Sequence, residues 1–350
     1  MCIRDRYGSF AQKIVSIVAI IYMSAFLIAE FASISFLFES ISNVSGIVVS
    51  SLVAATTFLY LNKSGFKASY VTDKIQGVGI ILLLTLLFGL WFSQNSFDEI
   101  TNFANLGGLS TFETYSLKSA LAVVIAVTAA EIFSTGYWQR TFSAVDETTI
   151  KKASVYSGLG VFITILLLGV AGAVGAGKGL ETPTLSFIDQ LSLNSLTVLV
   201  LISLATLLVT SSVDTLENAI SSTISIDIVK KGSKEANNIT LGVVVLALFA
   251  STRVTNIFTV FLVADLFATS LVFPAFYKIK KASKNMMLVV PFAGSLASVF
   301  LYRYLFIDLQ ENPGGLFVPT DLYGLADLNT FVVALLSSVI FTLVMDKFNK

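Results

Sequence analysis

The chain has 350 residues, of which 55% are hydrophobic and only 13% are charged, and its 22 basic residues balance its 22 acidic ones. A mean hydropathy of +0.85 is far above that of a soluble domain and predicts an integral membrane protein, with no nucleic-acid partner expected from a neutral chain. Histidine is absent and Cys2 is the one cysteine, which excludes internal disulfides, thiolate metal sites and histidine-based catalysis.

Residues 1–6 (MCIRDR) resemble the translated adapter sequence found at the ends of metagenomic gene models. A genuine short basic N-terminus is the alternative. We set these residues apart as a leader, as one would an expression tag, and expect a single transmembrane domain at residues 7–350.

Apolar stretches long enough, or nearly so, to cross a bilayer as helices then follow one another along the chain. We predict an all-α polytopic membrane protein with about ten transmembrane helices, of which the seventh is the shortest. Their expected positions are residues 14–38, 44–61, 76–92, 118–136, 153–176, 195–229, 238–251, 255–277, 285–304 and 329–346.

The connections between these spans alternate in charge. Lysine and arginine gather at residues 63–74, 140–152, 230–234 and 278–284. The intervening connections carry acidic residues: Asp98, Glu99, Glu113, Asp308, Glu311, Asp321 and Asp327. By the positive-inside rule this pattern predicts both termini of the chain in the cytoplasm, and we expect a bacterial inner (plasma) membrane.

A polar stripe crosses the sixth predicted span. Helical spacing places seven polar residues on one face: Ser211, Asp214, Thr215, Asn218, Ser221, Ser222 and Ser225. An aspartate at the centre of a membrane helix costs roughly 2.5–3.5 kcal/mol on insertion scales. We therefore expect this stripe to face other helices, a cavity or an ion, and to mark a functional site.

Three motifs in chain order carry a family resemblance. Residues 65–77 (GFKASYVTDKIQG), expected in an inner loop, are similar to a GG-x-x-A-x-x-x-T-D-x-x-Q segment. Residues 137–140 (YWQR) resemble a Q-R motif at the end of a core helix. The stripe that begins at Ser211 and reaches Asp227 resembles an S-S/T-x-D-S-x-L helix with an acidic end. Together they resemble the sodium:solute symporter family.

The resemblance implies a LeuT-like inverted-repeat helical bundle, with ions and solute bound near the midplane beside interrupted helices. Residues 7–277 would form core helices three to ten, and residues 285–346 two additional helices. The first two core helices would be missing from this gene model. On that alignment the chain alone is expected neither to bind sodium tightly nor to transport.

The resemblance also implies a sodium site formed by the hydroxyls of Ser211 and Ser212 with the backbone carbonyl of Leu208. Sodium is a hard cation that prefers such oxygen ligands. In the alternative interpretation these serines bond the carbonyl one turn back or let helices approach closely.

Four further residues are candidates for the ion pathway or its gating: Asp214, Thr215, Asp73 and Arg140. Asp214 either stabilises the cation-bound state or holds neighbouring helices in register, and Asp73 is either near the inner ion exit or a solvated loop charge. Arg140 is either a gating partner of an acid or an interfacial anchor.

The span at 118–136 matches the interrupted sixth core helix of the family, where Gly136 and small polar neighbours could permit a break. Candidates for the solute cavity are Glu131, Ser134, Thr135, Gly136 and Asp265. The family's sugar carriers have larger polar residues here, which argues against a sugar, and the YWQ string is similar to urea-permease relatives.

The resemblance implies a secondary active transporter that couples Na+ to a small polar organic solute by alternating access. A proton-coupled carrier is the first alternative, because Glu131, Asp214 or Asp265 could bind a proton. A membrane receptor or enzyme is the second, although the sequence shows no catalytic constellation. The solute, the sodium stoichiometry and the oligomeric state stay open.

Overall fold

A computed structural model describes residues 3–42, 44–111, 113–180, 185–229, 233–277, 284–308 and 314–348. The basic residues expected at 230–231 and 278–281 therefore lie outside the described residues. In the part that is described, the chain is helical and has no strand beyond an isolated bridge between Thr320 and Ala326. This confirms the predicted all-α class.

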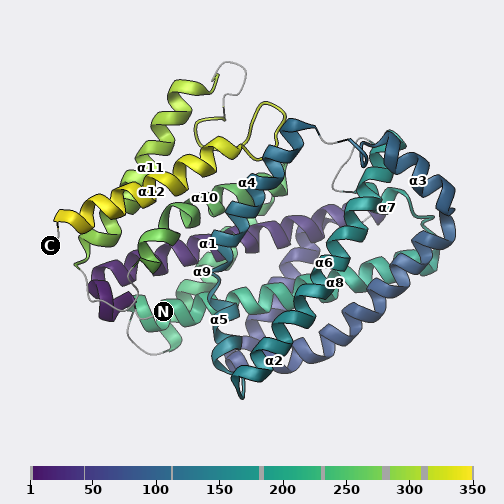
Figure 1. Ribbon diagram of the computed structural model, residues 1–350. Coiled ribbons are helices and arrows are strands. Elements are labelled where there is room, and N and C mark those ends of the chain that lie inside the picture. Colours follow the sequence, from purple (N-terminus) through teal and green to yellow (C-terminus); the bar gives the residue numbers. More distant parts are fainter. Residues whose placement is uncertain are drawn as a thin grey trace. The chain divides into compact units, whose positions relative to one another are not determined.

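Figure 1 shows the order of the helices along the chain. Their bounds are α1 (Ile3–Ile41), α2 (Gly46–Gln94), α3 (Phe97–Leu106), α4 (Thr114–Glu131), α5 (Thr135–Phe142), α6 (Glu147–Gly177), α7 (Ser186–Asp189), α8 (Ser195–Thr223), a π-helical turn (Ile224–Val229), α9 (Ser233–Ser251), α10 (Ile257–Phe276), α11 (Met286–Phe306) and α12 (Leu328–Phe348).

Nine helical stretches among the described residues are long and apolar enough to cross a membrane, and α2 contributes two of them, Gly46–Lys63 and Ser69–Gln94. The protein is thus a polytopic helical membrane protein. The seventh predicted span corresponds to α9, which is a helix but is not one of these nine stretches.

The prediction of an inner loop around residues 65–77 is wrong, because α2 is helical throughout this segment. The segment is polar but contains no proline, and its polar side chains repeat at helical spacing in Ser69, Thr72, Asp73 and Gln76. The polar side chains of this segment form one face of a helix, and that face packs on other polar groups. Their polarity was therefore no sign of a loop.

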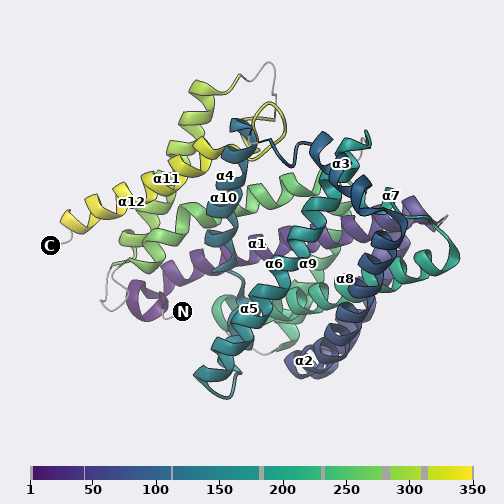
Figure 2. The same cartoon turned by 45° about the vertical axis from the view of Figure 1, so that its right-hand side comes forward.

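By their internal contacts the residues form two compact units. Unit 1 comprises residues 1–33, 114–136 and 215–350, and unit 2 comprises residues 34–113 and 137–214. In unit 1, α10, α11 and α12 pack on one another and α4 packs on α10 and α12, as Figure 1 and Figure 2 both show. In unit 2, α3 and α7 pack on α6.

Small residues make both packings close. In unit 1, α4 buries a run of alanines beside Leu262 and Phe331: Ala122, Ala126, Ala129 and Ala130. In unit 2, a Cβ atom on Gly107 or Gly177 would lie 1.9 Å from a backbone oxygen of the partner helix, so only glycine fits at the crossing of α3 and α6. Of the glycines before Lys178, Gly175 and Gly177 therefore allow close packing, whereas a Cβ atom on Gly169 or Gly172 would meet nothing within 4 Å.

The first described residues are helical and pack on the end of α10 within unit 1. Ile3 is buried, and Arg6 donates hydrogen bonds to the carbonyls of Ala275 (2.8 Å) and Tyr277 (2.6 Å). The Tyr7 hydroxyl donates to the carbonyl of Pro274 at 2.7 Å. The last carbonyls of a helix have no partner inside it, so these side chains cap α10.

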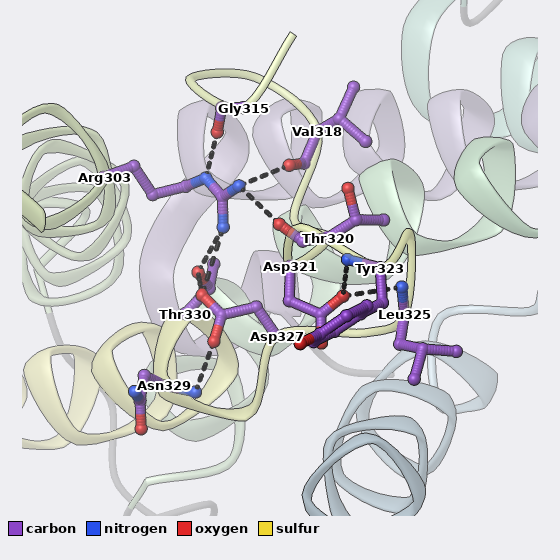
Figure 3. A network of polar contacts seen from close by, with 10 residues as sticks. All are labelled: Arg303, Gly315, Val318, Thr320, Asp321, Tyr323, Leu325, Asp327, Asn329 and Thr330. Atoms are coloured by element: carbon purple, nitrogen blue, oxygen red, sulfur yellow. Dashed lines mark hydrogen bonds and ion pairs between the residues drawn. The ribbon is translucent and has the colours of Figure 1, made fainter. Parts of the chain in front are cut away.

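A buried arginine organises the segment between α11 and α12 (Figure 3). Arg303 is 0% exposed and forms an ion pair with Asp327 at 3.2 Å. Its guanidinium also donates to the Thr330 hydroxyl at 2.6 Å and to three backbone carbonyls, those of Gly315, Val318 and Thr320. A planar guanidinium with five donors suits such a set of oxygens.

Two aspartates shape the same segment. The Asp321 carboxylate accepts hydrogen bonds from the backbone N–H groups of Tyr323 and Leu325, both at 2.9 Å. Asp327 accepts from the Thr330 hydroxyl at 2.5 Å and from the N–H of Asn329 at 3.1 Å, at the start of α12 (Figure 3). Asp321 and Asp327, two of the acidic residues expected in this connection, thus help to fold it.

Candidate functional site

The first polar cluster of unit 2 joins three of the predicted site residues. Asp73 of α2 forms an ion pair with Arg140 of α5, and the Ser211 hydroxyl of α8 donates to the other oxygen of Asp73 at 3.0 Å. The side chains of Asp73 and Arg140 are 20% and 31% exposed. Arg140 thus has an acidic partner, and both oxygens of Asp73 are bonded to side chains of other helices.

The second cluster of unit 2 surrounds Asp214, which is 0% exposed. Its carboxylate accepts hydrogen bonds from the hydroxyls of Tyr60 (2.5 Å), Ser69 (2.9 Å) and Thr72 (2.9 Å), all of which belong to α2. Buried charges persist only when hydrogen-bonded or paired, and three donors meet that need. Asp214 therefore ties α8 to α2.

The other predicted ion-site residues lie beside these clusters. Ser212 is half-buried and joins no hydrogen bond among the described residues, and the Leu208 side chain is 39% exposed. Thr215 is half-buried and belongs to unit 1.

The oxygens of Asp73 and Ser211 lie within hydrogen-bond distance of each other, so one small cation could contact both. Hard oxygen ligands of this kind fit sodium. In the structure Arg140 already balances the charge of Asp73. A sodium ion at this place would be coordinated by hydroxyl and carbonyl oxygens as well as by the carboxylate.

The predicted interruption of the span at 118–136 is present. Helix α4 ends at Glu131, residues 132–134 are non-helical, and α5 begins at Thr135. Ser134 is buried, and its N–H donates to the carbonyl of Glu131 at 3.2 Å. The break places the C-terminal end of α4 close to the N-terminal end of α5, so the ends of two helix dipoles lie near each other.

The residues around this break contact other helices of unit 1. The Thr135 hydroxyl lies 3.3 Å from the hydroxyl of Thr223 in α8 and donates to the sulfur of Met23 in α1 at 3.2 Å. Gly136 is buried. These contacts join three helices at the break.

Two carboxylates meet beside the break. Glu131 accepts a hydrogen bond from the Tyr22 hydroxyl, and its charge acts on Asp265 of α10, the helix on which α4 packs. Asp265 is 3% exposed, and its carboxylate has no hydrogen-bond donor among the described residues. The structure thus brings Glu131 and Asp265 together, which their separation of more than a hundred residues did not reveal.

The far end of the polar stripe serves helix packing in unit 1. Ser221 donates to the side-chain oxygen of Asn237 at 2.9 Å. Asp227 lies in the π-helical turn and accepts from Gln12 (2.5 Å) and Ser16 (2.7 Å) of α1.

Four residues that donate to the predicted carboxylates Asp214 and Glu131 were not predicted as site residues: Tyr60, Ser69, Thr72 and Tyr22. The signal for Ser69 and Thr72 was their spacing of three with Asp73 and Gln76, hidden by the expectation of a loop. The signal for Tyr22 was a hydroxyl group within an otherwise apolar run of the chain. Tyr60 ends the second predicted span and carried no comparable signal.

The fold and these buried polar clusters define a polytopic α-helical membrane protein that holds charged groups inside its helix packing. Over 360 aligned residues, covering 97% of this chain and 68% of the other protein, the chain is 23% identical to the spermidine transporter DUR31 of Candida albicans. No protein-family model matches the chain. The similarity supports a membrane transporter and speaks against an enzyme.

Proposed function

We propose that the protein is a secondary active transporter that couples sodium entry to the import of a small polar organic solute by alternating access. The observation that carries the proposal is the similarity of 97% of the chain to a transporter. The three motifs of the sodium:solute symporter family support the sodium coupling. The relative's name makes spermidine the first solute to test.

The two clusters of unit 2 have the chemistry that such a role needs. A carrier must hold and release a cation, and Asp73 can exchange the Arg140 contact for an ion while Ser211 stays beside it. One positive charge that enters across 100 mV releases about 2.3 kcal/mol, which can drive the uptake of a neutral solute. We further propose an inner-membrane location with both termini cytoplasmic.

The test is uptake into proteoliposomes that contain the full gene product. Radiolabelled spermidine is supplied outside under an inward sodium gradient, an inward proton gradient, or neither, with a potassium gradient as the ionic control. We expect accumulation only with sodium. Accumulation driven by protons alone would instead support the proton-coupled carrier, and no accumulation of any tested polar solute would contradict a transport function.

Replacing Ser211 or Ser212 by alanine is expected to raise the sodium concentration for half-maximal uptake about tenfold, because each substitution removes one oxygen ligand, a loss of roughly 1–3 kcal/mol. Sodium titration of uptake measures the effect. Ser222→Ala is the matched control, since Ser222 is a half-buried serine of the same helix and stripe. Unchanged sodium dependence in both variants would reject the sodium site.

A further inference from the structure

The carboxylates of Glu131 and Asp265 differ from three other acidic sites in the membrane-spanning helices, those of Asp73, Asp214 and Asp227. Asp73 is paired with Arg140, Asp214 receives three hydroxyls, and Asp227 receives two side-chain donors. Within the described residues, neither Glu131 nor Asp265 forms an ion pair with a lysine or arginine.

The hydrogen bonding of this pair is also incomplete. Asp265 is 3% exposed, near the middle of α10, and no described residue donates to its carboxylate. One oxygen of Glu131, Oε2, is buried and has no partner in the described structure, while the Tyr22 hydroxyl bonds the same carboxyl group. A buried carboxylate without donors is costly unless a cation or a proton accompanies it.

The local backbone favours a cation here. Glu131 is the last residue of α4, where the helix dipole places a partial negative charge. That partial charge adds to the charges of both carboxylates. Glu131 is half-buried, whereas Asp265 is buried.

Aromatic side chains extend from the pair along α1 and α10. The ring of Tyr22 lies 4.7 Å from that of Phe26, which lies 4.5 Å from that of Phe261, one helical turn before Asp265. Rings of this kind attract organic cations and pack on methylene chains. A metal ion could be coordinated by the carboxylates but would gain nothing from the apolar contacts that the rings offer.

We propose that Glu131 and Asp265 bind a protonated amino group of the transported solute, with Tyr22, Phe26 and Phe261 against its carbon chain. This inference rests on the proposed transport function and names the solute class as an alkyl diamine or polyamine. The two carboxylates have four oxygens, enough to accept hydrogen bonds from the three N–H donors of one ammonium group.

The experiment measures binding to the purified full gene product by calorimetry. The ligands are 1,4-diaminobutane and spermidine, with 1,4-butanediol as an uncharged control of equal chain length. The variants are Asp265→Asn and Glu131→Gln, which keep shape and remove charge. Asp227→Asn is the matched control in unit 1, because Gln12 and Ser16 already satisfy that carboxylate. Thermal melting in detergent confirms that each variant is folded.

We expect both amines to bind the unaltered protein and Asp227→Asn alike, and the diol to bind neither. Asp265→Asn and Glu131→Gln should each weaken amine binding at least about tenfold, as expected for loss of a charged hydrogen-bond partner. If Asp265→Asn does not fold, Glu131→Gln alone carries the test.

Three results would overturn the assignment. The first is an amine affinity that is unchanged in both variants. The second is a loss of sodium binding in both variants while amine binding is kept, which would show that Glu131 and Asp265 bind the coupling ion. A folded preparation that binds no amine would overturn it as well. If that preparation still takes up another solute under a sodium gradient, the proposed transport function stands and only the amine site fails.

Discussion

Arg303→Ala is expected to lower the free energy of unfolding by about 3–5 kcal/mol, the cost of removing one partner from a buried ion pair. The substitution leaves Asp327 without its cation and removes the donor shared by the carbonyls of Gly315, Val318 and Thr320. Since a domain is typically stable by about 5–15 kcal/mol, a loss of this size should lower the melting temperature markedly.

Thermal melting in detergent measures the effect. Arg303→Lys should fall between the alanine variant and the unaltered protein, because an ammonium keeps the charge but cannot reach all five acceptors at once. Arg253→Ala is the matched control, since Arg253 is exposed. Equal melting temperatures for Arg303→Ala and Arg253→Ala would show that the buried network contributes nothing to stability.

Asp214→Ala is expected to abolish uptake and to lower the free energy of unfolding by roughly 3 kcal/mol or more. The three hydroxyls of Tyr60, Ser69 and Thr72 lose their acceptor at once, and each buried group left unmatched costs roughly 1–3 kcal/mol. Because α2 and α8 are joined through this carboxylate, the residues of α8 that we propose to bind sodium should lose their position as well.

Asp214→Asn separates the structural role from the ionic one. Asparagine keeps one acceptor oxygen and the shape, so the loss of stability should be about 1 kcal/mol, as between a charged and a neutral hydrogen bond. If the charge serves the cation-bound state, uptake is still lost in this stable variant. Uptake equal to that of the control Asp98→Ala, at an exposed position, would restrict Asp214 to holding the helices.

Four buried or half-buried acidic groups thus fall into two kinds. In unit 2, Asp73 is paired with Arg140 and Asp214 accepts from three hydroxyls. In unit 1, Glu131 and Asp265 form no ion pair with a lysine or arginine among the described residues, and Oε2 of Glu131 has no hydrogen-bond partner there. In a medium that penalises charge, the first kind holds helices together and the second is where an added cation gains most.

The sequence by itself determined the class of the protein and most of its helices. Hydropathy and periodicity are local properties, so runs such as 195–229 and 285–304 predicted α8 and α11. Small and polar residues before Gly136 predicted the break between α4 and α5 for the same reason. The loop expected at residues 65–77 failed because local polarity does not distinguish a solvated loop from a helix face that packs on polar groups.

Only the tertiary structure decided which polar residues meet. Asp214 accepts hydrogen bonds from Tyr60, Ser69 and Thr72, which lie more than a hundred residues earlier in the sequence. The charge of Glu131 acts on Asp265, from which it is separated by a similar number of residues. Each of these side chains could equally have faced lipid, another helix or an ion when judged from its neighbours in the chain. Pairing depends on which helix faces lie against each other, and that is set by the packing of the whole unit rather than by any local pattern.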